Sequence, residues 1–166
     1  MSIRRAILLL LGLHLPAYAQ SPLRVHVEPR TVTDPEGDVR AVIDRLFEGM
    51  RTADSAMVRS TLATGARFAS VDSRATTPTI KFESPDGWIA AIANSGRKWD
   101  ERVFDVQIRV DRNIAQAWTP YTFYVEGKLR HCGVDSMELL RDADGWKITQ
   151  LSDTQIREGC RDVISR

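Results

Sequence analysis

The chain has 166 residues, of which 43% are hydrophobic and 27% are charged, and its formal net charge is +1. This length is sufficient for one domain with its own hydrophobic core, and the composition is that of an ordinary globular protein. The sequence contains no Lys/Arg stripe of the kind that binds phosphates. We therefore expect no nucleic acid among its partners.

The N-terminus has the pattern of a secretory signal peptide. Two arginines precede an apolar run at residues 6–15, and Ala17-Tyr18-Ala19 then forms an A-x-A cleavage site before Gln20. The apolar run is too short for a permanent membrane anchor, which is the alternative interpretation. We predict a signal peptide at residues 1–19 with cleavage after Ala19, a periplasmic or secreted mature protein, and no membrane association after cleavage.

Cys132 and Cys160 are the two cysteines of the sequence, and both lie in the part that remains after signal cleavage. In an exported protein, an even pair is more often a disulfide than a metal site or a nucleophile. We predict a Cys132–Cys160 disulfide, with two buried free thiols as the alternative. The three histidines are scattered, and one lies in the signal peptide, so we expect neither a metal nor another cofactor.

Residues 20–33 are polar and interrupted by proline, which indicates an extended lead-in. Asp34-Pro35-Glu36 then combines a capping residue, a proline and an acidic first turn, and this combination predicts a helix start. Apolar residues at helical spacing follow and predict an amphipathic helix that covers the core. These residues are Val39, Val42, Ile43, Leu46, Phe47 and Met50. We expect a single domain over residues 34–166.

Shorter elements follow the first helix. A second helix is predicted around Met57 and Val58, with Gly65 at its end, where glycine is favoured. Residues 67–73 and 79–83 alternate as short strands do. Ser84-Pro85-Asp86 predicts the start of a third helix.

From Trp99 the sequence changes to four successive β-type runs. They cover residues 99–111, 114–126, 128–142 and 146–153, and short turns link them. Short links between consecutive strands imply antiparallel neighbours. Helices and short strands followed by a long meander predict an α+β domain with its helices on one side of the sheet.

This order of elements resembles the nuclear transport factor 2-like (NTF2-like) or SnoaL-like superfamily, especially its exported bacterial branch of the lumazine-binding type. The residues that carry the resemblance are FYVEGKLRHCGVDS at 123–136, DGWKI at 144–148, Asp153-Thr154 and REGC at 157–160. The resemblance implies a cone-shaped α+β barrel whose helices and strongly curved sheet enclose one apolar pocket, usually in a homodimer. The fold hosts both enzymes and non-catalytic binders, so it does not define a function.

Polar residues on the run 128–142 suggest a wall of such a pocket. Side chains alternate along a strand, so His131 and Asp135 share one face while Cys132 lies on the other. The Cα atoms of His131 and Asp135 should lie roughly 13 Å apart, which excludes a direct His–Asp hydrogen bond of the triad type. Each therefore needs another partner. The predicted ligand pocket comprises Trp118, Tyr121, Tyr124, His131, Asp135, Met137 and Asp153.

Two functions remain open at this point. The first is an exported protein that binds a small, mostly apolar or aromatic ligand without transforming it. The second is a cofactor-free lyase or isomerase, with dehydratase-like or ketosteroid isomerase-like proton transfer by His131 and Asp135. We favour binding, because no nucleophile, metal cluster or phosphate loop supports a reaction. In an enzyme both groups should converge on an open cavity with a perturbed pKa, whereas in a binder protein partners should satisfy them.

Overall fold

The computed structural model describes residues 34–73 and 76–163, so the predicted signal peptide and lead-in lie outside the described residues. The helices are α1 (Pro35–Thr52), α2 (Ser55–Ser60) and α3 (Pro85–Asn94). The strands are β1 (Leu62–Asp72), β2 (Thr79–Glu83), β3 (Trp99–Val103), β4 (Gln107–Asp111), β5 (Ile114–Val125), β6 (Lys128–Asp142) and β7 (Gly145–Gln155). Within these ranges no helix is long and apolar enough to cross a membrane.

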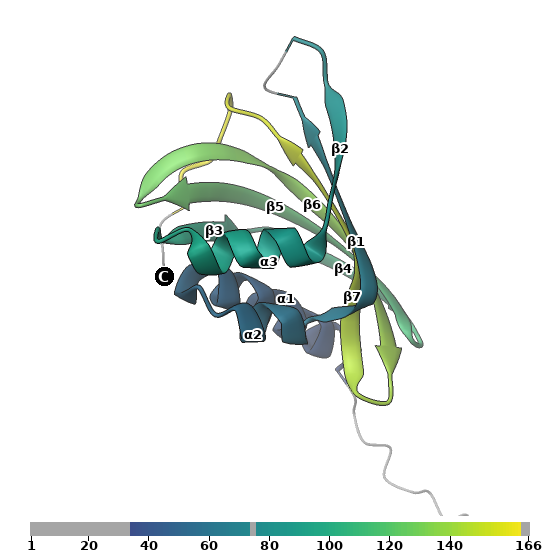
Figure 1. Cartoon of the computed structure of the whole chain (residues 1–166). Coiled ribbons are helices and arrows are strands. Elements are labelled where there is room, and N and C mark those ends of the chain that lie inside the picture. The colour runs from purple at the N-terminus through teal and green to yellow at the C-terminus, as the bar shows by residue number, and fades with distance from the viewer. Residues whose placement is uncertain (1–33, 74–75, 164–166) are drawn as a thin grey trace, which may run out of the picture. The chain divides into compact units, whose positions relative to one another are not determined.

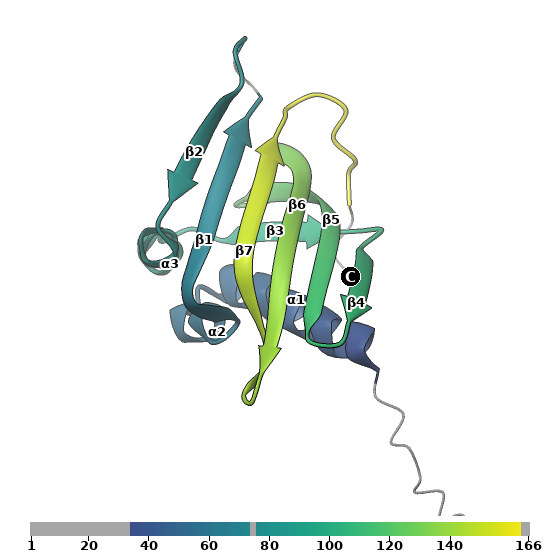
Figure 2. The same cartoon turned by 90° about the vertical axis from the view of Figure 1, so that its right-hand side faces the viewer.

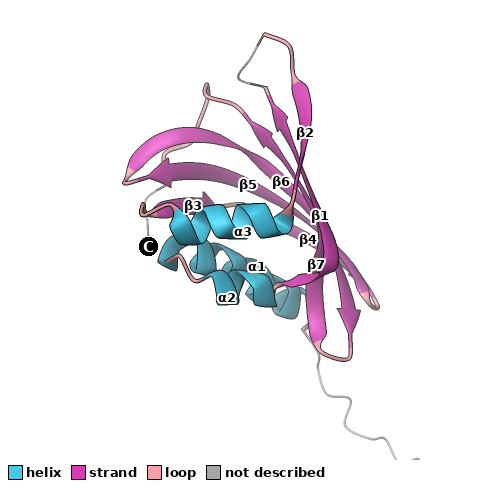
Figure 3. Ribbon diagram, in the orientation of Figure 1, coloured by secondary structure: helices cyan, strands magenta, loops and turns pink. Residues whose placement is uncertain are grey.

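The strands form one curved sheet, with the helices on its concave face (Figures 1 and 2). The strand order is β2-β1-β7-β6-β5-β3, and β4 also pairs with β5. Every pair is antiparallel except β1 with β7, which is parallel. Figure 3 shows how the helices gather on one side of the strands. The predicted α+β fold is therefore confirmed.

Helix α1 begins where the sequence predicted. The Asp34 carboxylate accepts a hydrogen bond from the Gly37 amide at 2.9 Å, which satisfies one of the amides that a helix start leaves without a partner. Its apolar stripe packs on the concave face of the sheet, and Ile43 and Leu46 have no exposed surface. The buried sheet residues of this core are Ala115, Ala117, Met137, Leu139, Trp146 and Ile148.

Helix α2 ends earlier than predicted. It stops at Ser60, and the chain enters β1 at Leu62, so Gly65 lies in a strand. Gly65 has a φ of 80° and lies where the pairing of β1 with β7 shifts register, a conformation that glycine adopts without steric cost. The prediction that Gly65 ends a helix is wrong, because pairing with β7 begins at Leu62.

The predicted single strand at 99–111 is two strands. β3 pairs with residues 121–125 of β5, and β4 pairs with residues 114–118. The break faces Pro120, which has no amide hydrogen to donate, although its carbonyl accepts from the Phe104 amide at 3.0 Å. Asp105 turns the chain there with a φ of 47°.

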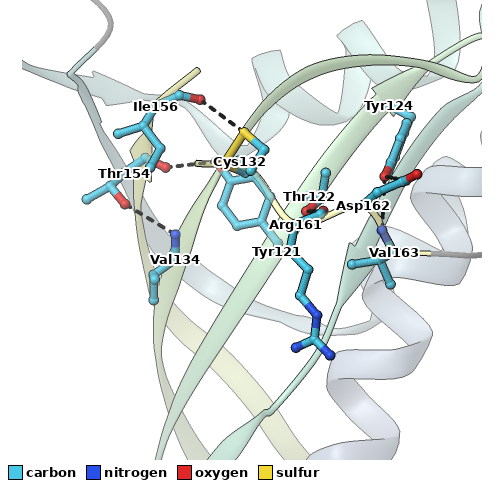
Figure 4. The surroundings of a disulfide bond; sticks show 11 residues. Tyr121, Thr122, Tyr124, Cys132, Val134, Thr154, Ile156, Arg161, Asp162 and Val163 are labelled. Carbon is cyan, nitrogen blue, oxygen red and sulfur yellow. Dashed lines mark hydrogen bonds between the residues drawn. A yellow bond between two sulfur atoms is a disulfide. The ribbon is translucent and has the colours of Figure 1, made fainter. Parts of the chain in front are cut away.

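After β7 the chain returns over the outer face of the sheet, and we call residues 156–163 the C-terminal clasp (Figure 4). The predicted disulfide joins Cys132 of β6 to Cys160 of the clasp, with Cα atoms 5.5 Å apart, and is confirmed. The Thr122 hydroxyl donates to the Arg161 carbonyl at 2.7 Å. The Tyr124 hydroxyl donates to the Asp162 carboxylate at 2.7 Å. The clasp is thus fixed to the side of the sheet that faces away from the helices.

Candidate functional site

A cavity of about 250 Å³ lies between the concave face of the sheet and helices α1 and α3. This volume is slightly below the usual range for small-molecule sites, which is roughly 300–1,000 Å³. Its lining comes from both helices and from six strands, β1, β2, β3, β5, β6 and β7. The lining residues are Leu46, Phe47, Met50, Phe68, Ala69, Ser70, Glu83, Trp88, Trp99, Glu101, Tyr121, Phe123, His131, Asp135, Leu151, Asp153 and Gln155.

Aromatic rings form much of the wall. The ring of Phe123 lies between Trp99, whose centroid is 5.8 Å away, and His131, whose centroid is 4.9 Å away. Tyr121 meets His131 edge to face at 5.8 Å. Such geometry is favourable for aromatic pairs, and these contacts hold the rings at the cavity wall.

Three carboxyl groups meet at one end of the cavity. Asp135 on β6 is 3% exposed and lies directly across from Asp153 on β7. The Thr119 hydroxyl donates to the Asp135 carboxylate at 3.2 Å. Glu101 on β3 brings a third carboxyl group, which forms a hydrogen bond with Asp135. The lining contains no lysine or arginine to compensate these groups.

This environment changes the protonation of the carboxyl groups. Burial raises the pKa of Asp135 to about 7, and the charge of Asp153 also raises it, while hydrogen bonds from Glu101 and Thr119 oppose the increase. Burial, followed by the charge of Asp135 and the hydrogen bond to it, raises the pKa of Glu101 well above its usual value. The raised pKa favours the protonated form of Glu101, which donates a hydrogen bond to Asp135.

Tyr121 lines the same end of the cavity. Its hydroxyl donates to the Thr154 carbonyl at 2.9 Å and to the Asp153 carboxylate at 3.2 Å. Burial, together with the charges of the three carboxyl groups, raises the pKa of Tyr121 above its ordinary value. Tyr121 therefore remains a neutral phenol that acts as a hydrogen-bond donor.

The structure brings together four of the seven predicted pocket residues. Tyr121, His131, Asp135 and Asp153 all line the cavity. Met137 lies on the same face of β6 as Asp135, but it is buried in the core and does not reach the lining.

Trp118 and Tyr124 do not line this cavity, because alternate residues of β5 point to opposite faces. Trp118 is 51% exposed on the outer face. Tyr124 shares that face and is covered by the C-terminal clasp. Tyr121 has an odd position in the strand, unlike Trp118 and Tyr124, so its side chain lies on the opposite face and lines the cavity.

The sequence prediction missed Glu101, Trp99 and Phe123. Trp99, Glu101 and Val103 alternate along β3, so a carboxyl group lies on an apolar strand face. That pattern could have identified Glu101 as a site residue, since a carboxyl group is rarely placed on an apolar face without a partner. Among the described residues, no group of three His, Cys, Asp or Glu side chains is arranged to hold a metal ion.

Comparison of the sequence with protein-family models gives no match, and comparison with curated proteins gives none either. Solved structures do match. An NTF2-like protein from Cytophaga hutchinsonii has a TM-score of 0.63 and 13% identity, over 75% of this chain and 100% of that one. An NTF2-like protein of unknown function from Shewanella baltica has a TM-score of 0.59 and 13% identity, over 78% of this chain and 100% of that one.

A third similar structure is an NTF2-like family protein from Streptomyces avermitilis, described as a candidate dehydratase. It has a TM-score of 0.56 and 14% identity, over 72% of this chain and 94% of that one. At these identities the likeness shows the fold. The chain has the NTF2-like fold, as the resemblance implied.

Proposed function

We propose that this chain is an exported protein that binds a small, mostly apolar or aromatic molecule in the cavity without transforming it. The observation that carries the proposal is the cavity itself, which has aromatic walls and a few converging polar groups at one end. This composition is typical of small-molecule sites. Asp135 already has protein partners in Thr119 and Glu101, which favours binding over reaction.

Export is supported by two observations of different kinds. The N-terminal sequence has the signal-peptide pattern. The Cys132–Cys160 disulfide is of the kind that persists in oxidising compartments such as the periplasm. Mature protein that begins at Gln20 should appear in the periplasmic or culture fraction, and an intact Met1 in that fraction would contradict the proposal.

Proton transfer is the second candidate function, and the raised pKa of Asp135, about 7, favours it. A carboxylate that titrates near neutral pH can act as a general base, and His131 lines the same cavity. In this alternative Asp135 removes a proton next to a carbonyl group. The test is deuterium incorporation into small ketones in D2O, followed by NMR, with wild type and Asp135→Asn. Incorporation that requires Asp135 would establish the reaction, and its absence across the panel would exclude it for those ketones.

A homodimer is the proposed assembly, as the family resemblance implies. Ile114, Trp118 and Leu140 lie on the outer face of β5 and β6, and each is at least 43% exposed. Apolar side chains grouped in this way are typical of protein contacts. Sedimentation equilibrium should give twice the chain mass, and a monomer at micromolar concentration would contradict the dimer.

The binding proposal is tested with neutral aromatic probes. We expect benzyl alcohol or 4-biphenylmethanol to quench the fluorescence of Trp88 and Trp99, both of which line the cavity. Ser70→Phe places a ring in the cavity and should abolish the quenching, whereas Ser136→Phe on the exposed face of β6 should not change it. Equal quenching in both variants would place binding elsewhere and overturn the proposal.

A further inference from the structure

A second depression adjoins the cavity and has the opposite charge. It is a more open groove of about 650 Å³, and it shares Trp99, Phe123 and His131 with the cavity. Because the two share these three residues, they form one continuous surface with an aromatic middle.

The groove is lined by arginines and contains no acidic residue. Arg97 precedes β3, Arg130 lies on β6 and Arg157 follows β7, and all three are exposed. Among the described residues, none of the three forms an ion pair, whereas Arg102 and Arg161 nearby do. Their guanidinium groups are therefore available to an anion, and the planar fork of arginine suits a carboxylate.

The cavity is lined by acidic groups, in contrast to the arginines of the groove. Glu101, Asp135 and Asp153 converge at one end of it, and its lining contains neither lysine nor arginine. An anionic group there would face three carboxyl groups, whereas an ammonium group would donate hydrogen bonds to them and balance their negative charge. A wholly anionic ligand is thus disfavoured by the cavity, and a wholly cationic one gains nothing from the groove.

We propose that the ligand is a zwitterion, with an amine in the carboxyl-lined cavity, an aromatic or apolar middle against Trp99 and Phe123, and a carboxylate in the arginine-lined groove. This inference rests on the proposed binding function and narrows it to one chemical class of ligand. Each part of the ligand corresponds to one part of the continuous surface, and the charge of each end is specified by the residues that it meets.

The test compares probes that share a scaffold and differ in charge. The zwitterions are 4-(aminomethyl)benzoic acid and its longer analogue 4′-(aminomethyl)biphenyl-4-carboxylic acid. The corresponding benzyl alcohols, benzylamines and carboxylic acids carry no charge or only one. Calorimetric titrations at about pH 8, where Asp135 is largely ionised, should show that one zwitterion binds about tenfold more tightly than its singly charged and neutral analogues.

Paired variants assign each end of the ligand. Arg130→Gln combined with Arg157→Gln should weaken zwitterion binding about tenfold and leave benzylamine binding unchanged. Arg109→Gln, at an exposed position of β4 outside both linings, is the matched control and should change neither. Asp135→Asn should weaken the amine and the zwitterion together.

Two results would overturn the inference, and they are distinguishable. If the neutral alcohol binds as tightly as the zwitterion, the cavity binds a ligand but the zwitterionic class is wrong. If no probe of either length binds, neutral or charged, the proposed binding function fails and the inference fails with it.

Discussion

Asp135 carries a carboxyl group in surroundings that oppose its charge. It is buried, it lies across from Asp153, and it accepts hydrogen bonds from Thr119 and Glu101. Its pKa is raised from 3.8 to about 7, so the folded chain holds this proton more tightly than the unfolded chain does. Stability therefore falls as the pH rises between these two values. In this range unfolding releases the proton that the folded state holds, and a higher pH favours that release.

The variant Asp135→Asn should remove the part of this pH dependence that comes from Asp135. Each pKa unit corresponds to about 1.4 kcal/mol, so the carboxylate costs the folded state up to about 4 kcal/mol above pH 7. We expect the variant to be more stable than wild type at pH 8 and nearly equal to it at pH 4, in urea unfolding followed by circular dichroism.

Asp111→Asn is the control for that series, because Asp111 is exposed at the end of β4. It should unfold as wild type does at both pH values. The account of Asp135 would be wrong if Asp135→Asn lost stability at pH 8, because that loss would mean that the charged form is the one that the fold stabilises.

At the scale of residues, strand parity was the useful part of the sequence. It correctly placed His131 and Asp135 on one face and Cys132 on the other. The same rule shows that Tyr121 and Tyr124 cannot both line a cavity from one regular strand. Glu101 could not be paired with Asp135 from the sequence, since their strands meet only through β5.

Strand β6 forms part of the cavity wall, and at Gly133 its backbone also lies very close to the end of β7. A Cβ atom added at Gly133 would lie 1.8 Å from the Thr154 carbonyl oxygen, and that same oxygen accepts the Tyr121 hydrogen bond. Only glycine fits this approach without moving backbone. Gly133 therefore maintains both the pairing of the strands and the position of Tyr121.

Gly133→Ala should force β6 and β7 apart and lower the free energy of unfolding by about 1–3 kcal/mol. It should also weaken binding of the neutral probes, because Tyr121 loses its carbonyl partner. The matched control is Gly87→Ala within α3, where the nearest atom is 3.8 Å from the added Cβ. That helix substitution should stabilise by about 0.5–1 kcal/mol. Equal effects of the two substitutions would contradict the close-approach explanation.

The clasp is the second element whose contribution can be measured separately. Its disulfide closes a loop with a sequence separation of 28 residues. In the chain-entropy treatment, a loop of this length stabilises the fold by about 3.5 kcal/mol. Cys132→Ala with Cys160→Ala should lower the urea midpoint accordingly, and reductant should lower the wild-type midpoint to the same value.

Because Cys132 lies on the face opposite the cavity, this double variant should keep its affinity for the neutral probes. A reductant effect that persists in the double variant would show that the loss of stability has another origin. A large loss of probe affinity would show that the clasp shapes the cavity.

Elements with strong local signals were predictable, and elements set by distant pairing were not. Asp34-Pro35 and the apolar stripe that follows predict α1 because capping and amphipathicity are local. The end of α2 and the division at residues 104–106 depend on pairing with β7 and β5, far along the chain. No local pattern encodes those partners, so Gly65 was misplaced and two strands were predicted as one.

At the scale of the molecule, the order of elements was enough to predict the fold. Three helices and two strands followed by a long antiparallel meander leave few ways to bury the apolar surfaces of helices and sheet, and the concave sheet with helices on one face is the result. The cavity follows from this curvature, since α1 and α3 cover the sheet without filling the space above Asp135. The identity of the ligand does not follow from the fold, because many functions share it.

The central claim is that the cavity holds a small molecule. Its most direct test is mass spectrometry of small molecules extracted from the protein purified from its own host, with wild type, Ser70→Phe and Ser136→Phe prepared in parallel. We predict that wild type and Ser136→Phe retain the same organic molecule, carrying both an amine and a carboxylate, and that Ser70→Phe loses it. Retention of that molecule by folded Ser70→Phe, or no retained molecule in any preparation, would contradict the claim.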